Sequence, residues 1–241
     1  VLTKEEIEEE KRDGMSDELV QQEYYCSFDR GVEGSYYSKL ITKMRDQERI
    51  GPLSYDPYKM VYTSWDLGWD DYTSVIFFQL SNDFIKIIDC EEKGTTTLPQ
   101  WKSILSAKGY KYGGHLFPHD VEQIDGLSSG CTRKEILEDL QIPVTTVPKG
   151  LISDGIESVK ALLSSRVMID SKKCEGLLKS LENYHRDWDD KHKVYSNKPR
   201  HDWSSHFSDS LRYLATGLHL IDNKGTSIED DAKALQKYFG S

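Results

Sequence analysis

Three short runs of β-branched and aromatic residues, close together in the chain, constrain the fold more than any other feature of the sequence. They occupy residues 60–65, 74–80 and 84–89, and turn-forming residues separate them at 68–71 and 81–83. Strands that follow one another at such short spacing pair as neighbours in an antiparallel meander. None of the runs approaches the roughly 20 apolar residues that a membrane-spanning helix needs. We therefore predict a sheet-based fold without a membrane span.

Helices and single strands alternate along the chain after this meander. Thr132 and Glu135 have the spacing of a capping box, in which each side chain bonds to the backbone N–H group of the other residue. We predict helices at 98–107, 132–140, 152–167, 171–188, 208–220 and 227–238, and further strands at 113–118 and 144–147. This order predicts an α/β fold, in which helices flank a central mixed β-sheet whose first three strands are antiparallel.

The first part of the chain differs in character from the rest. It is acidic and helical in pattern, and Gly51 and Pro57 break the pattern where the strand runs begin. A helix predicted at 35–49 carries apolar residues along one side. We assign residues 1–57 to an acidic helical lead-in outside the core, and residues 58–241 to one folded domain.

The charge of the protein is distributed unevenly. The net charge is −10, yet residues 160–206 carry 10 basic and 7 acidic side chains, against 17 and 29 in residues 1–159. A basic stretch in an acidic protein is typical either of contact with a polyanion or of a solvated helical face. The four cysteines form no C-x-x-C pair, which excludes a zinc ribbon and favours free thiols in a reducing compartment.

Three aspartates stand where apolar elements end or turn polar. Asp66 ends the first strand in SWDLG, Asp120 follows a later strand in PHD, and Asp209 lies on an apolar helix in HFSDSLRYL. Carboxylates that converge from two strand ends and one helix raise one another's pKa unless a cation compensates for their charge. An all-oxygen ligand set favours Mg²⁺ or Mn²⁺, and two such ions about 3.5–4 Å apart support hydrolysis of a phosphodiester. The pattern therefore favours a two-metal nuclease site.

Each aspartate also has a purely structural interpretation. Asp66 precedes Gly68 and fits a turn, and Asp120 fits the cap of the segment after its strand. Asp209 fits the first turn of a helix, where a carboxylate stabilises the helix dipole. Taken singly, the structural interpretation is favoured for each residue. The order, spacing and context of the three together favour the metal site.

Five segments of the chain resemble, in this order, the nuclease part of the large terminase subunits of tailed bacteriophages. They are EYYCSFDRGVEGSYYSKLI, YTSWDLGWDDYTSVIFFQL, IIDCEEKGTTTLPQWKSIL, HLFPHDV and SHFSDSLRYL, and the similarity runs from Gln22 to Leu220. The resemblance implies a ribonuclease-H-like fold and a metal-dependent endonuclease that cuts concatemeric viral double-stranded DNA when genome packaging begins and ends. It implies that Asp66, Asp120 and Asp209 are catalytic and bind two Mg²⁺ or Mn²⁺ ions.

The resemblance also implies partners. These are double-stranded DNA, the packaging ATPase domain of the same full-length protein, the portal and the small terminase subunit, in the cytoplasm of an infected bacterium. The sequence has no G-x-x-x-x-G-K-[ST] motif, so ATP hydrolysis is not expected of these 241 residues. We interpret the chain as the C-terminal nuclease part of a longer motor protein.

Residues near the third aspartate are further candidates. Asp202 and His206 are candidate auxiliary residues of the metal site, and His206 shares a helix face with Asp209 if the helix begins early. Structural capping is the alternative role for His206. A loop or hairpin before this helix carries four basic candidates for contact with DNA phosphates, which are Lys191, Lys193, Lys198 and Arg200.

Two other functions fit the same residues. A Holliday-junction resolvase or a transposase-like nuclease of the same fold needs an equivalent carboxylate trio. A non-catalytic module that grips DNA or docks on a capsid needs the fold but not the trio. Cleavage of plasmid DNA with and without divalent cations distinguishes the enzymes from the binding module.

Overall fold

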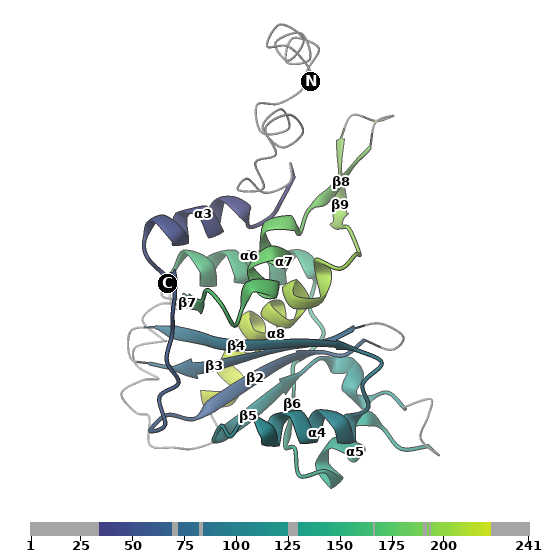
Figure 1. Cartoon of the computed structure of the whole chain (residues 1–241). Coiled ribbons are helices and arrows are strands. Elements are labelled where there is room, and N and C mark those ends of the chain that lie inside the picture. Colours follow the sequence, from purple (N-terminus) through teal and green to yellow (C-terminus); the bar gives the residue numbers. More distant parts are fainter. Residues whose placement is uncertain are drawn as a thin grey trace, which may run out of the picture.

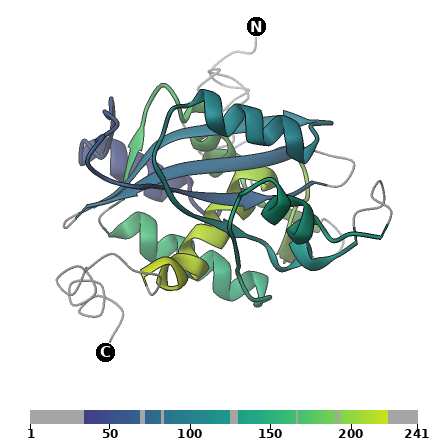
Figure 2. The same ribbon diagram turned by 90° about the horizontal axis from the view of Figure 1, so that it is seen from below.

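A mixed β-sheet with helices on both faces forms the centre of the protein (Figures 1 and 2). The computed structural model describes residues 34–68, 72–81, 84–124, 130–165, 167–189, 192 and 194–222. Within these residues the sheet has seven strands in the order β1-β7-β4-β3-β2-β5-β6. In the same part of the chain, every helix is too short or too polar to cross a membrane. The α/β architecture predicted from the sequence is confirmed.

The strands β2, β3 and β4 form the predicted antiparallel meander, while the other neighbours in the sheet pair in parallel. The bounds of the sheet strands are β1 Ile50–Gly51, β2 Val61–Asp66, β3 Tyr72–Leu80, β4 Ile85–Gly94, β5 Tyr112–Phe117, β6 Val144–Thr146 and β7 Val167–Asp170. A separate antiparallel hairpin consists of β8 Arg186–Asp189 and β9 Val194–Pro199. The helices are α3 Ser38–Asp46, α4 Leu98–Ala107, α5 Arg133–Asp139, α6 Ile152–Ser164, α7 Glu175–Asn183 and α8 Ser205–Asp222, with a 3₁₀ turn at His119–Glu122.

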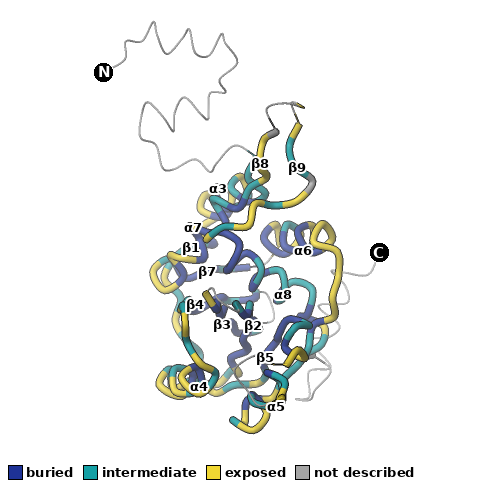
Figure 3. The backbone as a smooth tube through the Cα atoms, turned by 90° about the vertical axis from the view of Figure 1, so that its right-hand side faces the viewer, coloured by how far each residue is buried: buried dark blue, intermediate teal, exposed yellow. Residues whose placement is uncertain are grey.

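The sheet separates two apolar cores. On one face, side chains such as Tyr62 and Ile76 pack with those of α3, α6, α7 and α8. On the other face, Trp65 stacks on Phe117 and packs with residues of α4 and α5. Successive strand residues point to opposite faces, so two covered faces leave β2 and β3 buried along almost their whole length (Figure 3). The middle of the sheet is therefore a rigid platform for the residues at its edge.

Two of the predicted helices are shorter than the sequence pattern indicated. The helix expected at 152–167 ends at Ser164, and the apolar residues from Val167 onward form β7 between β1 and β4. The helix expected at 171–188 is α7 followed by β8. Both errors have the same cause, because a short apolar run beside a helix continues the helical pattern while tertiary pairing recruits it as a strand.

The described part of the expected lead-in belongs to the fold. Tyr37, Ile41 and Met44 of the α3 segment are buried in the core, and β1 pairs in parallel with β7. The boundary that we placed after residue 57 is therefore wrong for residues 34–57. The apolar spacing along α3 accounts for this burial. Residues 1–33 and the helix predicted at 227–238 lie outside the described residues.

Helix α8 passes close to the sheet at Gly217. A Cβ atom at this position would lie 2.6 Å from Cγ2 of Val147 and 3.3 Å from Cδ2 of Leu116. We predict that Gly217→Ala lowers the free energy of unfolding by about 1–3 kcal/mol, because overpacking outweighs the roughly 1 kcal/mol that alanine contributes in an open helix. Urea unfolding measures the change. Gly150→Ala, with no atom within 4 Å of its Cβ, is the control, and equal effects would contradict the close approach.

Candidate metal centre

The parallel pairing of β2 with β5 brings two of the three aspartates to one edge of the sheet. Ser64 lies opposite Leu116 in this pair, so both strands end at the same edge. Asp66 is the last residue of β2, and Asp120 follows β5 within the 3₁₀ turn. Their separation in sequence is large, but the register of two neighbouring strands places their backbones side by side.

Helix α8 is tied to the same edge by buried serines. The hydroxyl of Ser64 donates a hydrogen bond to the carbonyl of Ser210 at 2.7 Å, and the Ser210 hydroxyl donates to the carbonyl of Ser74 at 3.0 Å. Ser74 lies opposite Asp66 in the β2–β3 pair, so both side chains are on the face that α8 covers. Asp209, next to Ser210, is thereby held beside the end of β2.

The negative charges of Asp209 and Asp120 act on the buried carboxyl group of Asp66. The pKa of Asp66 is raised well above its usual value by burial of the carboxyl group, and then by the negative charges of Asp209 and Asp120. Burial also raises the pKa of Asp120. The pKa of Tyr213 is raised to about 12, mainly by burial, and all three carboxylates contribute to this shift. A concentration of negative charge therefore surrounds the end of β2.

The residues at this edge fit a hard divalent cation. Oδ1 of Asp120 is buried and has no hydrogen-bond partner, which is costly for a carboxylate unless a cation completes its environment. Carboxylate oxygens are the donors that Mg²⁺ and Mn²⁺ prefer. Over the described ranges, however, no three His, Cys, Asp or Glu side chains are already grouped as a metal site. The carboxylates are neighbours, and a cation would have to draw them together.

His206 lies one helical turn before Asp209 on α8 and contacts two residues of the sheet. His206 shares the helix with Asp209 because α8 begins at Ser205, as the candidate auxiliary role required. Its Nδ1 lies 3.0 Å from Oε1 of Glu92, and its ring stacks on Tyr72 with centroids 5.7 Å apart. Sequence reasoning missed Glu92 as a site residue. Glu92 lies opposite Ser74 in the β3–β4 pair, and only this register reveals that it shares the α8 face.

Asp202 occupies the start of α8. Its Oδ1 accepts hydrogen bonds from the backbone N–H and the hydroxyl of Ser204, at 2.9 and 2.6 Å. Oδ2 lies 3.4 Å from Nε of Arg200. These bonds satisfy donors at a helix N-terminus, so the geometry gives Asp202 a structural task at the entrance to α8.

Two of the four basic candidates, Lys198 and Arg200, lie on or next to the β8–β9 hairpin. Figures 1 and 3 show this hairpin extending away from the body of the protein, beyond α7. Lys198 is exposed on β9, and Arg200 is exposed just after it, 3.5 Å from the carboxylate of Asp187. Lys191 and Lys193 lie outside the described residues. The hairpin expected in front of the third aspartate is thus present.

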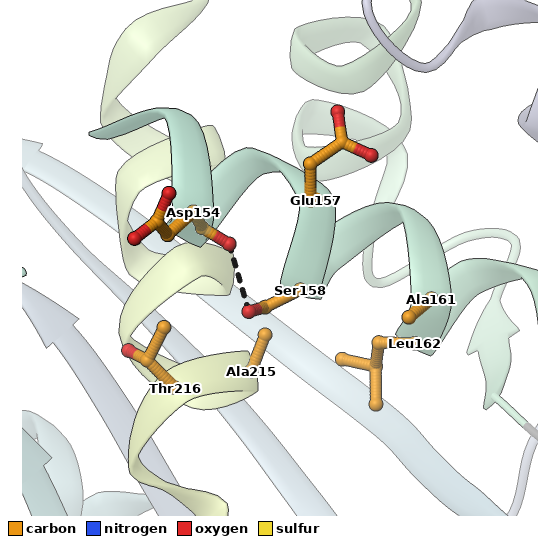
Figure 4. Close-up of a pocket in the computed structure, with 7 residues that line it drawn as sticks. All are labelled: Asp154, Glu157, Ser158, Ala161, Leu162, Ala215 and Thr216. Carbon is orange, nitrogen blue, oxygen red and sulfur yellow. Dashed lines mark hydrogen bonds between the residues drawn. The ribbon is translucent and has the colours of Figure 1, made fainter. Parts of the chain in front are cut away.

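A groove of about 610 Å³ lies between α6 and α8. Figure 4 shows Asp154 and Glu157 at its rim and Leu162 and Ala215 on its apolar side. None of the three aspartates lines it. Its acidic rim is unsuited to the phosphates of DNA, so we assign it no part in a nuclease site.

Comparisons with known proteins find related sequences and folds. No family model matches the sequence. The terminase large subunit of Escherichia phage T5 is 27% identical over 152 residues, which are 61% of this chain and 33% of that protein. The large terminase of the thermophilic bacteriophage D6E, solved with ADP, is similar with a TM-score of 0.58 at 20% identity, covering 91% of this chain and 52% of that one.

Isolated nuclease domains match over nearly their whole length. The large terminase nuclease of the thermophilic phage G20c, solved with cobalt, has a TM-score of 0.52 at 17% identity, covering 76% of this chain and 97% of that one. The nuclease domain of the SPP1 large terminase, solved with manganese, has a TM-score of 0.51 at 13% identity, covering 70% and 94%. This chain has the fold of a large-terminase nuclease domain.

The terminase resemblance and the ribonuclease-H-like fold predicted from the sequence are confirmed by these matches. The chain spans about a third of the T5 large subunit and about half of the D6E terminase. The D6E match extends over almost all of this chain, whereas the nuclease domains alone match about three quarters of it or less.

The raised pKa of Asp66 predicts a pH-dependent gain in stability when its charge is removed. Below the unfolded-state pKa of about 3.8, the carboxyl is protonated in both states. As the pH rises through the folded-state pKa, ionisation destabilises the folded protein, because the unfolded state ionises more easily. Without metal, Asp66→Asn should therefore raise the free energy of unfolding by more than about 1 kcal/mol near pH 7, since one pKa unit is worth about 1.4 kcal/mol.

Chemical denaturation of metal-free protein near pH 3.5 and near pH 7 measures this gain. Asp139→Asn, at an exposed position on α5, is the control and should show no such dependence. An equal gain at both pH values for Asp66→Asn would contradict the desolvated, crowded carboxyl.

Proposed function

We propose that this chain is a metal-dependent DNA endonuclease in which Asp66, Asp120 and Asp209 bind two Mg²⁺ or Mn²⁺ ions. The observation that carries the proposal is the buried Oδ1 of Asp120, which has no hydrogen-bond partner, at the sheet edge where Asp209 and Asp120 also act on the carboxyl group of Asp66. The fold of large-terminase nuclease domains supports the same conclusion, since two of the matching domains were solved with divalent metals.

Each residue of the site has a defined task in this proposal. The three aspartates supply the oxygen ligands, and bound divalent cations supply an activated water and stabilise the leaving oxygen of the phosphodiester. The imidazole ring of His206, on the same helix as Asp209, is oriented by its contact with Glu92. Asp202 acts on the site only through the start of α8.

The substrate that we propose is concatemeric viral double-stranded DNA, cut when packaging begins and ends. In this proposal the nuclease domain includes residues 34–222. It belongs to a longer protein with a packaging ATPase and acts in the cytoplasm of an infected bacterium together with the portal and the small terminase subunit. The T5 and D6E proteins support this context, because both are large terminases and both are longer than this chain.

DNA must approach an acidic protein with a net charge of −10 through a restricted surface. We propose that Lys198 and Arg200, with Lys191 and Lys193, contact phosphates from the β8–β9 hairpin. The hairpin leads directly into α8, which carries Asp209. Phosphate contacts carry no sequence information, so this surface suits a nuclease with little sequence preference.

Single Asn variants of Asp66, Asp120 and Asp209 test the site. Each keeps the side-chain shape but removes a ligand charge, so plasmid cleavage in Mg²⁺ or Mn²⁺ should fall by at least the roughly 10–100-fold that even outer-shell changes at metal sites cost. EDTA should abolish wild-type cleavage. Asp154→Asn, on the exposed start of α6, is the matched control and should cut normally.

The same assay decides between the candidate functions. Near wild-type cutting by any of the three variants would remove that residue from the site. DNA binding without cleavage in either metal would replace the nuclease by a binding module. Cleavage of four-way junctions in strong preference to linear duplex would replace it by a junction resolvase.

Charge reversal on the hairpin tests the DNA surface. The Lys198→Glu/Arg200→Glu variant should bind every DNA sequence more weakly. The slope of log affinity against log salt should become shallower by about 0.9 for each phosphate that the variant no longer neutralises. Lys39→Glu/Lys43→Glu, which reverses two exposed lysines of α3, is the matched control. Equal binding by both double variants would place the DNA elsewhere.

A further inference from the structure

Arg212 binds the third aspartate of the trio. It lies one helical turn after Asp209 on α8, and its side chain is only 14% exposed. Its Nε donates a hydrogen bond to Oδ1 of Asp209 at 3.2 Å, and its Nη2 lies 3.0 Å from the same oxygen. Both contacts fall on Oδ1, so this fork leaves Oδ2 to other partners.

Helix α6 has a glycine where the side chain of Arg212 packs against it. Gly155 of α6 faces the Arg212 side chain, and a Cβ atom there would lie 2.5 Å from Cδ and 2.6 Å from Cγ. The guanidinium carbon lies 5.0 Å from the ring centre of Tyr213. Figure 4 shows the adjacent stretch of the α6–α8 interface around Asp154 and Thr216. The stem of Arg212 is therefore fixed between two helices, which orients its fork toward Asp209.

The positive charge of Arg212 also reaches the rest of the carboxylate cluster. Burial alone would lower the pKa of Arg212, but Asp209 and the other groups around it hold that pKa above its usual value. An arginine remains protonated in proteins, so this cation is permanent. At Asp66, the charge of Arg212 opposes the effects of Asp209 and Asp120. Arg212 thus offsets part of the repulsion that a divalent cation would otherwise relieve.

We propose that Arg212 is a positioning residue that holds Asp209 and acts as the resident counter-charge of the aspartate trio, so that it limits the affinity of the site for divalent cations. This inference rests on the proposed function, because it assumes that the trio binds metal. A purely structural Arg212 would only fill the space beside Gly155. The two roles differ in their effect on metal binding.

Arg212→Met separates the two roles because methionine fills much of the same space without a charge. Mn²⁺ binding, followed by the EPR signal of free Mn²⁺, should become about tenfold tighter, the size expected when one charge several ångströms from a divalent ion is removed in a high dielectric. Without metal, the Arg212→Met variant should melt at a lower temperature than the wild type. Saturating Mn²⁺ should raise the melting temperature of the variant by more than it raises that of the wild type. Arg212→Lys, which keeps the charge, should bind Mn²⁺ within about twofold of wild type.

Further variants keep the result interpretable. Lys160→Met removes a cation that is paired with Glu157 at 2.8 Å on the surface of α6, and it should leave Mn²⁺ binding unchanged. If Arg212→Met does not fold, Arg212→Gln replaces it with the same expected direction. Mn²⁺ affinity in the uncharged variant that is equal to wild type or weaker would overturn the role of Arg212. Asp209→Asn tests the premise separately, because unchanged Mn²⁺ binding in that variant would overturn the proposed function itself.

Discussion

The hydrogen bonds between buried serines of the sheet and α8 are the interaction on which the site depends. Ser64 and Ser74 are fully buried hydroxyls of the sheet, where an unpaired hydroxyl is costly. Both are satisfied by α8, through the carbonyl groups of Ser210 and His206. These bonds fix the helix along and around its axis. Asp209, the neighbour of Ser210, is thereby held beside the end of β2.

The site concentrates charge that the fold alone does not need. The carboxyl group of Asp66 is desolvated and lies near other carboxylates. The positive charge of Arg212, which is paired with Asp209, offsets part of their repulsion. Such crowding destabilises the metal-free protein, which is a pattern typical of functional sites and uncommon at purely structural ones. Asp66 on β2, Ser74 on β3 and Glu92 on β4 lie opposite one another across the sheet, and Glu92 contacts His206 on α8.

The sequence predicted the elements far better than their contacts. The meander, α4 and the capping box at Thr132 follow from local patterns, and the structure confirms them. The pairing of β7 depends on its neighbours in space, so its short run was absorbed into a helix. Glu92 was missed for a related reason, because its place on the α8 face follows from strand register, which no spacing along the chain reveals. Arg212 lies three residues after Asp209, a spacing that brings two side chains together on a helix, but its packing against Gly155 of α6 does not follow from the sequence.

A crystal of this chain soaked in Mn²⁺ tests the central claim most directly, because anomalous scattering locates the ion without reference to activity. The account predicts manganese between the carboxylates of Asp66, Asp120 and Asp209, with Oδ1 of Asp120 among its ligands. Manganese bound at another part of the protein, with the three aspartates left unligated, would contradict it.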